Sequence, residues 1–121
     1  MSYDIDLVYE KANGEKLLAK GMPHTEGGTI AIGGDNCASM NVTYNYGFFY
    51  YHFLDKDLGI RWLYGKKAKD TVERLEAAIK ILGTKKYEKD YWAPTPGNAG
   101  HALNVLLGWA KQHPVAIWQG D

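Results

Sequence analysis

A seven-residue stretch, MNVTYNY at residues 40–46, decides the fold that we expect for this chain. Its side chains alternate in character and most of its residue types favour β-structure, so it predicts a strand over the whole stretch. Successive side chains of a strand point to opposite faces, so one face carries apolar and aromatic groups. The other face carries three neutral polar side chains, those of Asn41, Thr43 and Asn45.

The sequence on the N-terminal side of this stretch predicts further strands. Residues 3–9 read as a strand, and a turn signal at Asn13-Gly14 separates them from residues 16–19, which predicts a β-hairpin. Residues 29–32 form a short apolar run between two glycine pairs, which predicts another short strand. Together these segments indicate a small antiparallel sheet.

The sequence on the C-terminal side is more helical. The aromatic run at residues 48–54 is compatible with a short helix or a strand, and we favour the helix. Residues 72–82 place apolar side chains at helical spacing, which predicts an amphipathic helix. Asp70 and Glu73 match a capping box at its start, and Gly83 is a stop signal at its end.

The last helix is marked by its ends and by its buried stripe. Thr95 is the expected N-cap, Pro96 takes the first helical position, and Pro114 ends the helix. Residues 115–118 then form an extended tail. The apolar stripe consists of Ala99, Ala102, Leu103, Leu106 and Ala110. The sequence therefore predicts one α+β domain over residues 1–121, a small antiparallel sheet with an N-terminal hairpin packed against two main C-terminal helices.

The composition limits the partners of the protein. Fourteen basic and 14 acidic residues give a formal net charge of zero, so nucleic acid is not an expected partner. The chain has a single cysteine, Cys37, and no charged-then-apolar leader. No apolar run approaches the roughly 20 residues that a membrane span requires. We therefore expect a cytoplasmic protein with no membrane partner.

The three polar side chains on one face of the expected strand are the first candidate binding site. If Asn41, Thr43 and Asn45 packed against an apolar surface, each would lose hydrogen bonds at a cost of about 1–3 kcal/mol. The face therefore either meets water, which is the ordinary structural explanation, or hydrogen-bonds a defined ligand. Neutral amides and hydroxyls are suited to recognising a base or a sugar.

The segment before the last helix is the second candidate. A helix N-terminus presents unpaired amides and the positive end of the helix dipole, which suits a phosphate. Thr95 and Asn98 lie at this start, and Trp92 precedes them, where it would stack on a planar group. Gly97 and Gly100 would let a ligand approach the first turn. The alternative is an ordinary capped helix, because the spacing matches neither a Walker nor a dinucleotide glycine motif.

Arg61 is the third candidate. It is one of two arginines and stands beside Trp62. Its guanidinium would hold a phosphate in a bidentate fork or stack on a ring, and it would equally well hold a structural carboxylate. Tyr44 is a candidate for stacking on the planar part of the same ligand.

Motifs for catalysis or metal binding are missing from the sequence. The four histidines lack metal-ligand spacing, so we expect neither a metal nor another cofactor. The sequence contains no Ser-His-Asp order, no nucleophile elbow and no marked carboxylate pair. If the protein were an enzyme, its acid–base groups would come from His52, His101 and Asp90.

Several blocks are spread over nearly the whole chain. They are MSYDIDL at 1–7, GGT at 27–29, GG at 33–34, NVTYNY at 41–46, GIR at 59–61, YG at 64–65, DYW at 90–92, PTPGNA at 94–99 and WQGD at 118–121. In this order the blocks resemble a family of small proteins common in bacteriophage and prophage genomes. The resemblance implies a setting rather than an activity, namely a phage accessory protein that acts in the cytoplasm of a host bacterium.

In that setting, small proteins without catalytic motifs often act by binding. Our first expectation is a homo-oligomeric protein that sequesters a phosphate-bearing, nucleotide-like molecule as a counter-defence. Its ligand would contact Asn41, Thr43, Tyr44, Asn45, Arg61, Trp92, Thr95 and Asn98. One alternative is an inhibitor that docks its aromatic run on a host defence protein. A second alternative is a small nucleotide-modifying enzyme.

Overall fold

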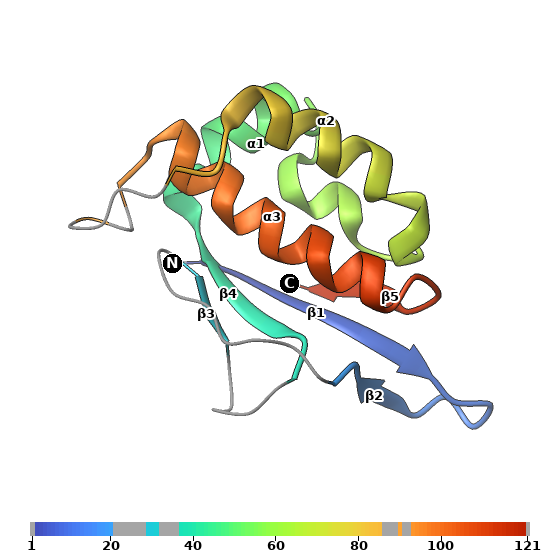
Figure 1. Ribbon diagram of the computed structural model, residues 1–121. Helices are drawn as coiled ribbons and strands as arrows, with labels where there is room; N and C mark the ends of the chain where they lie inside the picture. Colours follow the sequence, from blue (N-terminus) through green and yellow to red (C-terminus); the bar gives the residue numbers. More distant parts are fainter. Residues whose placement is uncertain (1, 21–28, 32–36, 86–89, 91–92, 121) are drawn as a thin grey trace.

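The computed structural model describes residues 2–20, 29–31, 37–85, 90 and 93–120. A small antiparallel sheet forms one layer, and the helices pack over one of its faces (Figure 1). Helix α3 (Pro96–Gln112) lies across the sheet, and helix α2 (Val72–Leu82) packs against α3. The expected fold class, α+β with an antiparallel sheet and C-terminal helices, is therefore confirmed.

The sheet is organised around its first strand. Its strands are β1 (Ser2–Glu10), β2 (Lys16–Leu18), β3 (Thr29–Ala31), β4 (Ser39–Thr43) and β5 (Ile117–Gly120). Four of them follow the order β2-β1-β4-β3, and β5 also pairs with β1. Ile5 and Asp6 pair with residues of both β4 and β5, so these two strands flank β1 on opposite edges. The N-terminal hairpin is confirmed, whereas the expected C-terminal tail is a strand of the sheet.

The two faces of the sheet differ in polarity, as the alternation in the sequence requires. Tyr3, Ile5 and Leu7 of β1 are buried in the core, and so are Met40 and Val42 of the neighbouring β4. The intervening side chains lie on the face that the helices leave open, where Asp4 is exposed (Figure 1). The sheet therefore has one apolar face under the helices and one polar face.

The strand β4 is shorter than the sequence predicts. It ends at Thr43, and residues Tyr44–Tyr46 form a 3₁₀ turn, η1. The Thr43 hydroxyl accepts a hydrogen bond from the backbone N–H of Asn45 at 3.2 Å, which turns the chain out of the strand. The following aromatic run forms the helix α1 (Gly47–Phe53), so the helical alternative for this segment is confirmed.

The start of α2 differs from the expected capping box. A 3₁₀ turn, η3 (Ala68–Asp70), comes first, and the N-cap is Thr71, which makes no side-chain capping bond. Instead the Thr71 hydroxyl donates to the carbonyl of Ala68 at 2.7 Å. The capping role assigned to Asp70 and Glu73 is therefore wrong. The stop at Gly83 is confirmed, because this residue has φ 77°, a value that favours glycine.

The helix α3 begins as predicted, with Thr95 as its N-cap and Pro96 as its first residue. Two glycines near its start let α3 approach the segment after α2. A Cβ atom on Gly100 would lie 1.7 Å from the Gly83 carbonyl oxygen, and one on Gly97 would lie 2.0 Å from that of Lys85. These two glycines therefore serve close helix packing, in place of the ligand approach that we expected.

The core contains several of the aromatic rings that make this sequence unusual. Trp109, Trp118, Tyr46 and Tyr50 are among its largest fully buried side chains. The Tyr50 hydroxyl donates to the carbonyl of Ala99 at 3.0 Å, which ties α1 to α3. Among the described residues, no helix is both long and apolar enough to cross a membrane.

Candidate functional site

Arg61 lies among tyrosines at the end of the sheet where β1 begins. It belongs to a 3₁₀ segment, η2 (Gly59–Leu63), that follows α1. Its guanidinium carbon is 4.9 Å from the centre of the Tyr3 ring and 5.8 Å from that of the Tyr44 ring. Its Nη2 also donates to the Tyr44 hydroxyl at 3.4 Å. The structure thus brings together Arg61 and Tyr44, two of the residues that the sequence analysis selected.

Three elements and the segment after η2 supply the tyrosines around this arginine. We call Arg61 together with Tyr3, Tyr44, Tyr51 and Tyr64 the Arg61 cluster. Tyr3 comes from β1, Tyr44 from η1, Tyr51 from α1, and Tyr64 follows η2. Gly120 makes room for one of the rings, because a Cβ at this position would lie 2.3 Å from Cζ of Tyr64. Gly59 also lies beside a ring, that of Tyr51, but a Cβ there would be at an ordinary contact distance of 3.4 Å.

The electrostatics of the Arg61 cluster agree with this geometry. Burial lowers the pKa of Arg61, but charge on Tyr3, Tyr44, Tyr64 and Tyr51 raises it more, so the net pKa lies above its usual value. Burial, together with the neighbouring Tyr51 and Tyr44, raises the pKa of Tyr3, although Arg61 lowers it. Around neutral pH the cluster therefore combines a cationic guanidinium with a neutral, hydroxyl-bearing Tyr3.

The exposure of the rings decides which of them a ligand reaches. Tyr3 is 4% exposed, whereas Tyr44 is 37% and Tyr51 is 38% exposed. Tyr44 therefore offers a ring surface beside the guanidinium of Arg61. An aromatic face next to a fixed cation suits a ligand that has both a planar ring and an anionic group.

The polar side chains of 41, 43 and 45 do not form the single wall that a continuous strand would produce. Asn41 stays on the open face of β4, where its amide donates to Ser2 Oγ at 2.5 Å and to Asp4 Oδ1 at 2.7 Å. Thr43 accepts from the Asn45 amide, and Asn45 lies on η1 with an exposed side chain. Asn41 therefore belongs to a hydrogen-bonded group on the sheet, while Asn45 is presented next to Tyr44.

The start of α3 is closed by its own side chains. Thr95 Oγ1 accepts a hydrogen bond from the backbone N–H of Asn98 at 3.1 Å. The fully buried Asn98 donates through Nδ2 to the carbonyls of Asp90 and Ala93 at 3.2 and 3.1 Å. Thr95 therefore caps the helix, and Asn98 holds the chain that precedes it. Trp92, selected for stacking in the same segment, lies outside the described residues.

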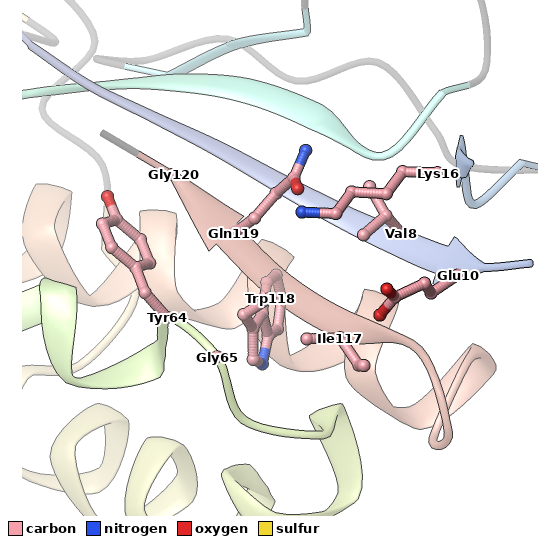
Figure 2. A pocket seen from close by; sticks show the side chains of 9 residues that line it. All are labelled: Val8, Glu10, Lys16, Tyr64, Gly65, Ile117, Trp118, Gln119 and Gly120. Atoms are coloured by element: carbon pink, nitrogen blue, oxygen red, sulfur yellow. The ribbon is translucent and has the colours of Figure 1, made fainter. Parts of the chain in front are cut away.

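Hollows on the described surface lie beside the Arg61 cluster. One of about 190 Å³ follows the edge of β5, and Figure 2 shows its lining. It contains Tyr64 and Gly120 at one end, while Lys16 extends across β1 toward Gln119. A neighbouring hollow of about 370 Å³ shares Lys16, Gln119 and Gly120 and adds two carboxylates, those of Asp4 and Asp6. The first hollow shares Tyr64 with the Arg61 cluster, and the lining of the second includes no member of the cluster.

The acid–base candidates from the sequence are spread over different elements. His52 lies on α1, where its ring is 4.4 Å from that of Phe48, whereas His101 lies on α3 and Asp90 precedes that helix. Among the described residues, no group of three or more His, Cys, Asp or Glu side chains is arranged to hold a metal ion.

Three of the five members of the cluster were not selected from the sequence. Tyr3, Tyr51 and Tyr64 stand at widely separated positions, so no local motif connects them with Arg61. The available signal was compositional, since nine tyrosines in a chain of this size exceed what a small core accommodates. Comparisons of this chain with protein-family models, with curated proteins and with solved structures find no match.

Proposed function

We propose that this protein binds and sequesters a small phosphate-bearing, nucleotide-like molecule at the Arg61 cluster. The observation that carries the proposal is the contact between Arg61 and Tyr44, which sets a cation beside a partly exposed aromatic ring. The guanidinium would bind a phosphate oxygen, and the Tyr44 ring would stack on the base. Asn45, on the same turn as Tyr44, would hydrogen-bond the edge of the base.

The resemblance to phage and prophage proteins gives this activity a setting. A phage protein of this kind would act in the host bacterium, where it would withdraw a nucleotide signal used in defence. Binding without chemical change suffices for that role. The ligand would therefore be recovered intact from the protein.

Thermal-shift measurements test the proposal, with cyclic dinucleotides, cyclic oligonucleotides and ADP-ribose derivatives as probes. A ligand present at 100 times its dissociation constant adds about 2.7 kcal/mol to the stability of the protein. We expect a clear shift for one probe and its intact recovery by mass spectrometry. No shift for any probe would contradict the proposal, and recovery of an altered probe would indicate an enzyme.

A matched pair of arginine variants locates the site. Arg61→Gln removes the cation from the cluster and should weaken binding at least about tenfold, the equivalent of about 1.4 kcal/mol. Arg74→Gln is the control, because Arg74 also lies over an aromatic ring, 4.2 Å from the centre of Trp62, but belongs to α2 and not to the Arg61 cluster. Equal effects of the two substitutions would show that binding depends on net charge and not on the Arg61 cluster.

A second candidate function is docking on a host protein through α1. The observation that favours it is the exposure of apolar rings on this helix, 63% for Phe48 and 38% for Phe53. Aromatic side chains are enriched in protein interfaces. Under this candidate Phe48→Ser abolishes capture of a defined host protein by the purified chain, whereas Ile81→Ser, at an equally exposed position on α2, does not.

A further inference from the structure

The ring of Tyr3 contacts both residues that carry the proposed function. Its centre lies 4.9 Å from the guanidinium carbon of Arg61. It also lies 4.6 Å from the centre of the Tyr44 ring, with the two ring planes 62° apart. A cation over an aromatic face and an edge-to-face pair of rings are both arrangements that the ring quadrupole stabilises. One side chain of β1 therefore joins the cation of the site to the ring on which a base would stack.

The sheet and the core fix the position of this ring. Tyr3 is 4% exposed, and its backbone pairs with that of Val42 in β4. Its hydroxyl reaches the start of α1, since a Cβ on Gly47 would lie 3.2 Å from Tyr3 Oη. A side chain enclosed in this way cannot change its rotamer without displacing close-packed neighbours. Tyr44 is 37% exposed, so the core holds it less firmly than it holds Tyr3.

The contact of Arg61 with Tyr3 is closer than its contact with Tyr44. The guanidinium carbon lies 5.8 Å from the centre of the Tyr44 ring, near the limit of about 6 Å for a cation–π contact. The hydrogen bond from Nη2 to the Tyr44 hydroxyl is long, at 3.4 Å. A long side chain that a ligand must immobilise loses rotamer entropy on binding. A contact that orders Arg61 on folding removes this cost from the binding step.

We propose that Tyr3 is a positioning residue of the Arg61 cluster: its buried ring holds the guanidinium of Arg61 and the ring of Tyr44 in the relative position that a planar, phosphate-bearing ligand requires. This inference rests on the proposed function and adds to it a determinant of affinity that lies in the core. Tyr3 acts through its two neighbours, and its ring supplies the effect. Phenylalanine should therefore replace Tyr3, and leucine should not.

The first experiment follows the order of the Arg61 side chain in the ligand-free full chain, by the heteronuclear NOE of its Nε nitrogen. We expect an ordered Nε–H group in the unchanged protein, in Tyr3→Phe and in Tyr44→Leu, and loss of this order in Tyr3→Leu. Tyr44→Leu replaces a partly exposed ring, so it gives a result even where Tyr3→Leu does not fold. An Arg61 side chain that is mobile in the unchanged protein or in Tyr44→Leu overturns the proposal.

The second experiment measures the affinity of the folded variants for the probe found in the thermal-shift screen, a cyclic dinucleotide, a cyclic oligonucleotide or an ADP-ribose derivative. Tyr3→Leu should weaken binding at least about tenfold, the equivalent of about 1.4 kcal/mol, and Tyr3→Phe by less than about twofold. Trp109→Leu removes another buried ring, on α3, and is the control for lost stability that should leave the affinity unchanged.

A double variant separates a positioning role from a general structural one. Because Tyr3 acts through Arg61, adding Arg61→Gln to Tyr3→Leu should weaken binding by less than about threefold further, although Arg61→Gln alone weakens it about tenfold. Losses that multiply independently overturn the positioning role.

The outcomes also distinguish this role from the proposed function. Tight probe binding by folded Tyr3→Leu, together with weakened binding by Arg61→Gln, overturns the positioning role while the proposed function stands. An unchanged protein that binds none of the probes contradicts the proposed function and, with it, the positioning role, whatever the order of Arg61.

Discussion

The indole of Trp118 donates from Nε1 to the hydroxyl of Thr71 at 3.0 Å, in the buried core. The Thr71 hydroxyl in turn donates a hydrogen bond to the carbonyl of Ala68 at 2.7 Å. The last strand is therefore tied to the turn that starts α2 by a chain of two hydrogen bonds. This connection explains why a polar side chain is fully buried at position 71.

Replacing Thr71 by valine keeps the shape of the side chain but removes both hydrogen bonds. The Trp118 indole and the Ala68 carbonyl then remain buried without this partner, so Thr71→Val should lower the free energy of unfolding by about 1–3 kcal/mol. Urea denaturation followed by tryptophan fluorescence measures this loss. Thr84→Val, at an exposed position, is the control and should change stability by less than about 0.5 kcal/mol. Equal losses for both variants would contradict the role assigned to Thr71.

Two glycines of α3 should respond in opposite directions to the same substitution. Gly100→Ala places a methyl group 1.7 Å from the Gly83 carbonyl oxygen, so α2 and α3 must move apart and stability should fall by more than about 1 kcal/mol. Gly108→Ala meets no described atom within 4 Å and should stabilise the helix by about 0.5–1 kcal/mol. Thermal denaturation of the two variants checks the pair, and a loss of stability in Gly108→Ala would show that this site is filled.

Asn98 is expected to be required for folding rather than for ligand recognition. Its Nδ2 donates to the carbonyls of Asp90 and Ala93. Asn98→Asp replaces this donor by an acceptor that faces two carbonyl oxygens in a buried place, so stability should fall by at least about 2 kcal/mol. Thr95→Ala removes only the cap and should cost about 1 kcal/mol. Urea denaturation compares them, and a stable Asn98→Asp variant would return Asn98 to the list of ligand-binding candidates.

The sequence predicts those parts of the fold that depend on neighbouring residues. The cap at Thr95, the stop at Gly83 and the hairpin around Asn13-Gly14 are local signals, and the structure contains all three features. The parts that depend on distant contacts were missed. β5 is a strand because β1 pairs with it, and α2 has Thr71 as its N-cap in place of the capping box expected from Asp70 and Glu73, with the Thr71 hydroxyl bonded to Ala68 and Trp118.

The same distinction applies to the candidate site. Arg61 and Tyr44 were selected for their chemistry, and the fold brings them together. The remaining tyrosines of the Arg61 cluster come from β1, α1 and the segment after η2, and only the tertiary structure places them around one arginine. Asn45 was assigned to a strand face because alternation in the sequence continues past Thr43, although the hydroxyl of Thr43 ends the strand there.

Buried tyrosines should make the protein lose stability in alkaline solution. Burial raises the pKa of Tyr50 well above its usual value of 10.0, and it also raises the pKa of Tyr3. Above pH 10 a tyrosine of the unfolded chain releases its proton while the folded Tyr50 keeps it. The unfolded state then binds fewer protons, so the free energy of unfolding falls by about 1.4 kcal/mol per pH unit for each such group.

The Tyr50→Phe variant isolates this effect from the titration of the lysines. At neutral pH the variant lacks the hydrogen bond to Ala99 and should be less stable by about 1 kcal/mol. Its deficit should shrink above pH 10 and then reverse, because phenylalanine has no proton to lose. Urea denaturation at several pH values between 8 and 11 measures the difference. Ile60→Val, a core substitution without a titratable group, should show a constant deficit, and a constant deficit for Tyr50→Phe as well would mean that Tyr50 ionises as readily in the folded protein as in the unfolded chain.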